Sequence, residues 1–205
     1  MLRLAGQAPF RFRPLSSNVR PHMTAIDANR ANFESWYGSV LEALYPNRDA
    51  GIATFMVTLP LAERYIRQVN AVPPDQDLND QCMQSLCVLF PALTGVQLAR
   101  QFWSAYRHGF LHQAAMSPST RAGKSLPIAW LSHDIAAPVE IRPDGSLWVH
   151  PVLFSQVVLA AIRSNFSVFV GHGSAGVPLP TTVIHMGTPG SLPITPTYIG
   201  TGGRP

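Results

Sequence analysis

Apolar residues first recur regularly just after Asp27, and their spacing predicts a long amphipathic helix. Asp27 or Asn29 is suited to cap its start, and Pro46-Asn47 is expected to end it. The apolar positions fall at intervals of three and four, the period of one helical face: Phe33, Trp36, Tyr37, Val40, Leu41, Leu44 and Tyr45.

A second helix is predicted over Gly51–Val69, where apolar residues again dominate. Pro60 lies inside it, and we expect a kink there because the proline ring removes one backbone hydrogen bond. Glu63 follows on this apolar helix, where an acid must either face water or meet a cation. The candidate cations are Arg64 and Arg67 nearby and Arg107 across the fold.

Two more helices are predicted before the pattern changes. The first covers residues 78–90, with Asp75 or Asp77 as its cap and Pro91 at its end. The second covers residues 96–114, with apolar positions at Leu98, Phe102, Trp103, Tyr106, Phe110 and Leu111.

Beyond residue 118 the pattern becomes that of short strands, at residues 126–131 and 139–141. The turn Pro143-Asp144-Gly145-Ser146, answered by Leu147-Trp148-Val149, predicts a hairpin. A fifth helix is expected to start at His150-Pro151, since proline is favoured at the first helical position, and to reach Phe169. The predicted fold is therefore mainly α, a bundle of four to five helices with a small β-hairpin insert at about residues 126–149.

The two ends of the chain lack this patterning. Residues 1–25 are predicted to form a disordered leader; their arginines suggest a transit peptide, but three prolines interrupt any helix, and Met23 is an alternative start. Residues 171–205, rich in glycine and proline, are expected to be disordered or to wrap irregularly over the body or a neighbour. The folded domain is expected over residues 26–170.

Composition adds expectations about partners and location. The chain is 46% hydrophobic and only 13% charged, which favours surface hidden in an oligomer, and its net charge of +4 favours an anionic partner. Cys82 and Cys87 have the spacing of neither a zinc knuckle nor a redox pair, so we expect reduced core thiols and a cytoplasmic protein. No apolar run reaches the roughly 18 residues of a membrane span. No zinc signature, phosphate loop or nucleophile elbow is present, so no cofactor or metal is expected.

The chemically most suggestive residues end the fourth predicted helix, in Arg107-His108-Gly109-Phe110-Leu111-His112. The forked donors of Arg107 suit phosphate, and His112 can exchange protons near neutral pH. Together they predict metal-free chemistry at a phosphodiester. A plain alternative exists for each residue, because cations are favoured near helix C-termini and Glu63 can simply pair with Arg67 one turn away.

A helical bundle with Arg107, His108, a three-residue spacer and His112 resembles the HEPN superfamily. In that superfamily an arginine is usually followed by Asn, Asp or His, then three residues and a histidine. The resemblance covers about residues 27–170 and includes the hairpin insert before the last helix. It implies an all-α bundle that works as a two-fold homodimer.

Many members of that superfamily are metal-independent RNases, often toxins of toxin–antitoxin or phage-defence systems. The resemblance therefore implies RNA and an antitoxin protein as partners. It also implies that the RNA 2′-OH attacks the adjacent phosphorus, with His112 as general base or acid and Arg107 stabilising the phosphoryl oxygens. His108 would orient the phosphate or share proton transfer, and Glu63 would hold Arg107 or a histidine in place.

Other members are inactive and serve as dimerisation or binding modules. The low charge content favours this alternative, because RNA binders usually carry more lysine and arginine. A third option is a small-ligand binder that uses the apolar interior of the bundle.

Overall fold

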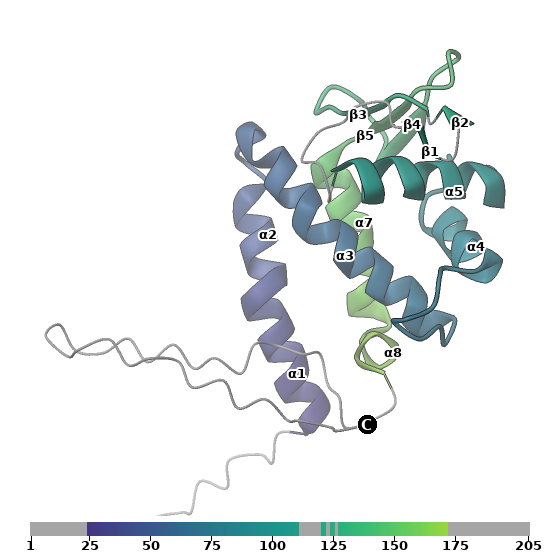
Figure 1. Cartoon of the computed structure of the whole chain (residues 1–205). Coiled ribbons are helices and arrows are strands. Elements are labelled where there is room, and N and C mark those ends of the chain that lie inside the picture. The colour runs from purple at the N-terminus through teal and green to yellow at the C-terminus, as the bar shows by residue number, and fades with distance from the viewer. Residues whose placement is uncertain (1–23, 111–119, 122–123, 126, 172–205) are drawn as a thin grey trace, which may run out of the picture.

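The structure, a computed structural model, describes residues 24–110, 120–121, 124–125 and 127–171, and between residues 108 and 126 it describes no side chains. The described part is mainly helical with a small sheet, as the sequence predicts. Figure 1 shows the first helical segments as one rod, α3 crossing the centre, and the sheet at one end above α5. Most of the predicted leader and tail lie outside the described residues.

The first rod begins with α1 (Ala25–Phe33), two residues before the predicted start. Thr24 is its cap, where Asp27 or Asn29 was predicted. The Thr24 hydroxyl accepts a hydrogen bond from the Asp27 amide at 3.1 Å, and the Asp27 carboxylate accepts one from the Thr24 amide at 3.2 Å. This reciprocal pair satisfies two amides that a helix start leaves open, so the helix begins earlier.

The rod continues through the π-helical segment η1 (Glu34–Gly38) into α2 (Ser39–Leu44). A π-turn holds more residues than an α-turn. The side chains after it are therefore rotated about the helix axis relative to their directions in a regular α-helix. Phe33 and Leu41 are buried, whereas Trp36 and Val40 are 45% and 48% exposed. Only part of the predicted apolar stripe therefore faces the core.

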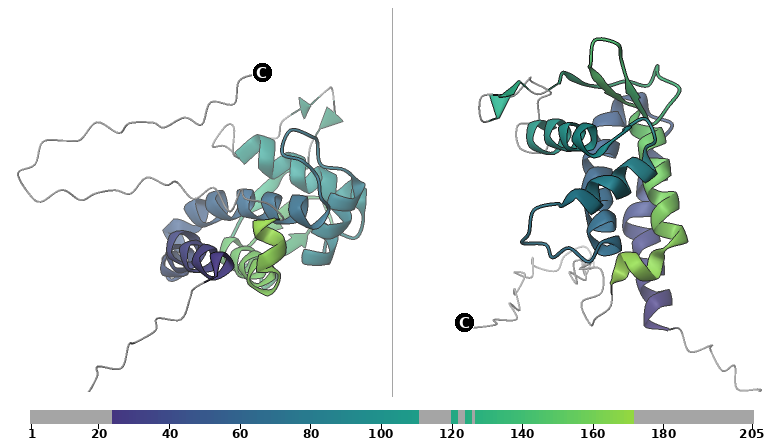
Figure 2. Two further views of the ribbon diagram at one scale, coloured as in Figure 1. Left: turned by 90° about the horizontal axis from the view of Figure 1, so that it is seen from below. Right: turned by 90° about the vertical axis from the view of Figure 1, so that its right-hand side faces the viewer.

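Helix α3 (Gly51–Val69) follows the short helix η2 (Arg48–Ala50) and forms the centre of the fold, with the predicted bounds. It is helical over its whole length although it contains Pro60. It packs mainly on α7 (Pro151–Ser164), and Figure 2 shows these two helices side by side from two further directions. The core beside them is rich in aromatic rings: Phe55, Phe90, Phe102, Tyr106 and Phe154.

Helices α4 (Asp80–Leu89) and α5 (Val96–Ser104) pack against each other next to α3. The cap of α4 is Asn79, whose side chain accepts a hydrogen bond from the Cys82 amide at 2.9 Å, where Asp75 or Asp77 was predicted. Helix α5 runs into a second π-helical segment, η3 (Ala105–Phe110). The rest of the predicted fourth helix lies outside the described residues.

The insert contains the predicted hairpin and also the strand predicted at residues 126–131, which is shorter than predicted. Strands β4 (Val139–Ile141) and β5 (Leu147–Val149) form that hairpin, and β3 (Ala129–Leu131) adds a strand parallel to β5, giving the order β3-β5-β4. Before it, β1 (Thr120–Arg121) and β2 (Lys124–Ser125) form a separate antiparallel pair.

The last predicted helix is divided in two at Asn165. Helix α7 starts with Pro151 as predicted, and the ring nitrogen Nδ1 of His150 caps it by accepting from the Leu153 amide at 3.2 Å. Asn165 leaves the helical conformation and donates to the Tyr65 hydroxyl at 3.1 Å, and α8 (Phe166–Val170) follows. Asparagine is a weak helix former because its side chain can hydrogen-bond to nearby backbone groups in non-helical conformations. This accounts for the break in the helix. Among the described residues, no helix is long and apolar enough to cross a membrane.

Candidate functional site

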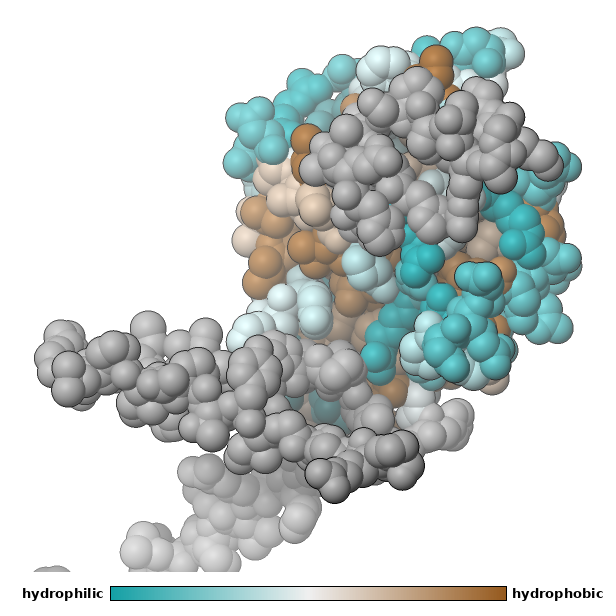
Figure 3. All heavy atoms as spheres, viewed as in Figure 1, coloured by the Kyte–Doolittle hydropathy of each residue, from teal (hydrophilic) through white to brown (hydrophobic). Residues whose placement is uncertain are grey.

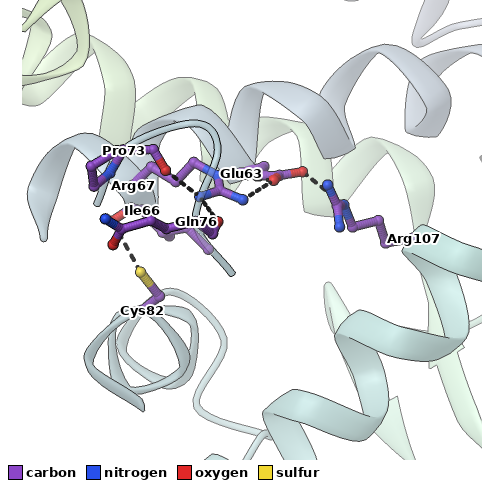
Figure 4. A network of polar contacts seen from close by, with 7 residues as sticks. All are labelled: Glu63, Ile66, Arg67, Pro73, Gln76, Cys82 and Arg107. Atoms are coloured by element: carbon purple, nitrogen blue, oxygen red, sulfur yellow. Dashed lines mark hydrogen bonds and ion pairs between the residues drawn. The ribbon is translucent and has the colours of Figure 1, made fainter. Parts of the chain in front are cut away.

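Glu63 joins two arginines in a network that links α3 to η3 (Figure 4). Its oxygen Oε1 accepts hydrogen bonds from Nε and Nη2 of Arg67 at 2.9 and 2.7 Å. Its second oxygen, Oε2, accepts one from Nε of Arg107 at 3.0 Å. The side chains of Arg67 and Glu63 are only 10% and 16% exposed. Both carboxylate oxygens therefore accept their hydrogen bonds largely shielded from solvent.

Arg67 is also tied to the loop after α3. Its Nη1 donates to the carbonyl oxygens of Pro73 and Gln76 at 2.9 and 2.8 Å. Every nitrogen of its guanidinium group is therefore engaged, and the loop is held against the helix. The role of Arg67 is structural.

Arg107 is engaged differently. It lies in η3, with a side chain that is 32% exposed, and Glu63 holds it through Nε alone. Within the described residues, neither of its terminal nitrogens has a hydrogen-bond partner. Two arginines share one carboxylate, so this network carries one surplus positive charge, and the surplus faces outward at Arg107.

Tyr106 fixes the backbone next to Arg107. Its side chain is fully buried, and its hydroxyl donates to the carbonyl oxygens of Trp130 and Leu147, at 2.8 and 2.9 Å. Burial raises the pKa of this hydroxyl far above its ordinary value, so it stays protonated and remains a donor. The segment that carries Arg107 is thereby anchored to β3 and β5.

A hollow of about 220 Å³ opens beside Arg107, and Arg100, Trp103 and Ser104 also line it. It is smaller than the roughly 300 Å³ at which pockets begin to enclose drug-sized ligands, and the acid Asp77 also lines it. Arg100 is already paired with Asp80 through Nε and Nη2. The indole nitrogen of Trp103 is buried with no hydrogen-bond partner among the described residues.

The structure thus brings together two of the four predicted site residues. Glu63 meets both the partner predicted on its own helix, Arg67, and the one predicted across the fold, Arg107. Arg64, the third candidate cation, instead donates to the carbonyl oxygens at the end of α8. Only the backbone of His108 is described, and His112 lies outside the described residues, so their roles stay predictions.

Several other polar candidates contact neighbouring side chains, although Nε2 of His133 is buried without a hydrogen-bond partner among the described residues. The ring of His133 packs edge-on against His150 with centroids 5.0 Å apart, and Asp134 pairs with Arg48 at 2.6 Å. Both cysteines are free thiols, and burial raises the pKa of each. Within the described ranges, no cluster of His, Cys, Asp and Glu is suited to hold a metal ion.

Sequence reasoning missed Arg100 and Trp103 as neighbours of Arg107. Their positions, seven and four residues before it, place all three on one helical face, and this spacing is visible in the sequence. The anchoring role of Tyr106 has no such signal, because its partners are backbone atoms of strands far along the chain.

Comparisons with protein-family models, curated proteins and solved structures find no match.

Proposed function

We propose that this chain is a HEPN-like protein that cleaves RNA without a metal ion, using Arg107 and His112. The observation that carries the proposal is that, among the described residues, only Nε of Arg107 is bonded, while Arg107 lines a hollow of about 220 Å³. A guanidinium group held at Nε presents its two terminal nitrogens as a fork, the geometry that binds two phosphate oxygens at once. The π-helical backbone around Arg107 adds support, because such segments are frequent at functional sites.

The proposed reaction is a transfer within the RNA. The 2′-OH attacks the neighbouring phosphorus while a general base removes its proton, the bond to the 5′-oxygen breaks, and a general acid protonates that oxygen. His112 acts as base or acid, and Arg107 stabilises the charge that gathers on the phosphoryl oxygens. His108 orients the phosphate or shares the proton transfer. Glu63 is a positioning residue that holds Arg107, and the working unit is a homodimer in the cytoplasm.

The test uses the purified full chain with RNA in the presence of EDTA. We expect cleavage products that end in a 2′,3′-cyclic phosphate, and a loss of about 100-fold or more in rate for His112→Ala. His185→Ala, which removes a histidine outside the motif, is the matched control and should cleave like the parent chain. Intact RNA under these conditions, or equal rates for the two variants, would remove the catalytic proposal.

A non-catalytic dimerisation module is the second candidate, and exposed apolar side chains favour it. Val40 on α2 and Ile52 and Met56 on α3 are 48%, 56% and 37% exposed. Figure 3 shows apolar surface over α2 and the start of α3. Large exposed apolar residues that gather on one face are typical of protein interfaces.

Light scattering after size exclusion, combined with the RNA cleavage assay, separates the two candidates. If Met56→Glu turns a dimer into a monomer, and the Arg107→Ala and His112→Ala variants treat RNA no differently from the parent chain, the chain is an interaction module. If the two motif variants lose cleavage, the enzyme is supported whatever the oligomeric state. Co-expression with a candidate antitoxin protein then tests whether growth arrest depends on His112.

A further inference from the structure

The outer face of the three-stranded sheet carries a row of aromatic and charged side chains. Along each strand the side chains alternate, and Val139, Leu147 and Val149 point into the core. The residues between them point outward. The register places Trp130 of β3 beside Trp148 of β5, and Trp148 beside Glu140 of β4.

The two indole rings stack on each other, with centroids 5.7 Å apart and planes inclined by 28°. Trp130 is nevertheless 45% exposed, and Ile128 just before it is 47% exposed. Trp148 is fixed in place because its indole nitrogen donates to the Ser146 hydroxyl at 2.9 Å. Trp130 stacks on this fixed ring and is itself open to solvent, so it is suited to stack against a ligand.

A cation borders this aromatic pair. The guanidinium carbon of Arg142 lies 4.7 Å from the ring centre of Trp148, and its Nε pairs with Glu140 at 2.6 Å. Within the described part of the chain, no residue bonds its two terminal nitrogens. Arg142 therefore resembles Arg107: a carboxylate holds Nε, and the forked end is left for an acceptor.

We infer that Trp130, Trp148 and Arg142 form a platform for single-stranded RNA, with a base stacked on Trp130 and a phosphate at the terminal nitrogens of Arg142. The choice of RNA as occupant rests on the proposed function. Flat π-faces next to forked cations are the combination that binds single strands, since bases stack on the rings and the cation contacts the backbone. An apolar protein partner would leave the terminal nitrogens of Arg142 buried without acceptors, which is unfavourable.

Tyr106 ties this platform to the proposed cleavage site. Its hydroxyl bonds the carbonyl oxygen of Trp130, and Arg107 is the next residue in the chain. Figure 1 shows the sheet above the helix labelled α5. An RNA strand stacked on the platform is therefore held in a fixed relation to Arg107.

The test is fluorescence anisotropy with a labelled, 2′-O-methylated single-stranded oligonucleotide, which lacks the attacking hydroxyl and cannot be cleaved. We expect Trp130→Ala to weaken binding by about 10- to 100-fold, and Trp130→Phe to keep most of the affinity. Trp36→Ala removes an indole of equal exposure, 45%, from a different element and should bind like the parent chain. Arg142→Gln should weaken binding and lower the dependence of log K on log salt by about one.

The outcomes separate the platform from the cleavage proposal. If the oligonucleotide fails to bind, or if Trp130→Ala and Trp36→Ala bind equally, the platform is wrong even where RNA is cleaved. Binding that depends on Trp130 in a chain that cleaves no RNA supports the platform and removes the nuclease. If Trp130→Ala changes only the oligomeric state, the face joins copies of the chain, and the inference is overturned.

Discussion

Two ion networks in this fold have opposite charge balances. In the first, Arg163 of α7 binds two carboxylates of the first rod, Glu34 at 2.9 and 2.6 Å and Glu42 at 2.7 Å. In the second, the single carboxylate of Glu63 binds both Arg67 and Arg107. The first network has a surplus acid and no unused guanidinium nitrogen. The second has a surplus cation, Arg107, whose terminal nitrogens have no hydrogen-bond partner among the described residues.

This difference separates a structural cross-link from a candidate binding site. Arg163 joins α7 to η1 and α2, and its Glu34 partner lies against Gly38, where an added Cβ would collide with that carboxylate. Bonding to Glu34 and then Glu42 raises the pKa of Arg163, so the arginine stays charged. Within the described part of the chain, Arg107 is bonded only through Nε, and it lines a hollow of about 220 Å³. A network of the second kind is the one that can accept a ligand anion.

The largest stability effect is expected for Arg67→Ala. Arg67 is nearly buried, and its removal leaves Oε1 of Glu63 and two loop carbonyls without donors. Breaking a buried pair in this way lowers the free energy of unfolding by about 3–5 kcal/mol. Urea unfolding monitored by circular dichroism measures it. A loss below that of Arg163→Ala would contradict the structural role given to Arg67.

A smaller loss is expected for Arg163→Ala, because its partners are partly exposed and water can replace the missing donors. We expect the free energy of unfolding to fall by about 1–2 kcal/mol in the same experiment. The control is Arg48→Ala, which breaks a pair whose members are mostly exposed and which should change stability by less than about 1 kcal/mol. Equal losses for both variants would show that the cross-link adds nothing beyond a surface pair.

A third and smaller effect concerns the dependence of stability on pH, through His150. Burial, and then the neighbouring His133, lower the pKa of His150, whose Nδ1 must stay unprotonated to cap α7. The unfolded chain therefore binds more protons below the ordinary histidine pKa of about 6.5, and the free energy of unfolding falls as the pH drops through that value. Arg48 and Asp134 also face this ring.

His150→Asn sharpens this prediction, since asparagine keeps a cap acceptor and does not titrate. Unfolding curves recorded from pH 7.5 to pH 5 should show a shallower decline for the variant than for the parent chain. Identical slopes would place the acid-sensitive group elsewhere.

Much of the fold could be predicted because local patterns agree with it. The bounds of α3, the start of α7 at Pro151 and the turn before Leu147 each follow from neighbouring residues alone. The π-turn at Glu34–Gly38 could not be predicted, since its residues read as a regular helix, and it turned Val40 toward solvent. Strand β3 is parallel to β5, and such a pairing depends on contacts distant in sequence.

At the candidate site too, the contacts between near neighbours could be predicted, and those that depend on the folded chain could not. The pairing of Glu63 with Arg67 follows from a spacing of four residues, and the sequence offers Arg107 as one of three cations for the same acid. What the sequence leaves out is which guanidinium nitrogens are used, and this detail distinguishes Arg107 from Arg67. It depends on the loop carbonyls of Pro73 and Gln76, whose positions only the folded chain defines.

The most direct measurement is the rate of RNA cleavage in EDTA for Arg107→Ala and Arg163→Ala, each corrected for the folded fraction. The account predicts that Arg107→Ala loses about 100- to 1,000-fold in rate, because a donor to the phosphoryl oxygens is gone. Arg163→Ala should keep the parent rate although it is less stable. Equal corrected rates for both variants, or a parent chain that leaves RNA intact, would contradict the claim that the surplus cation at Arg107 serves catalysis.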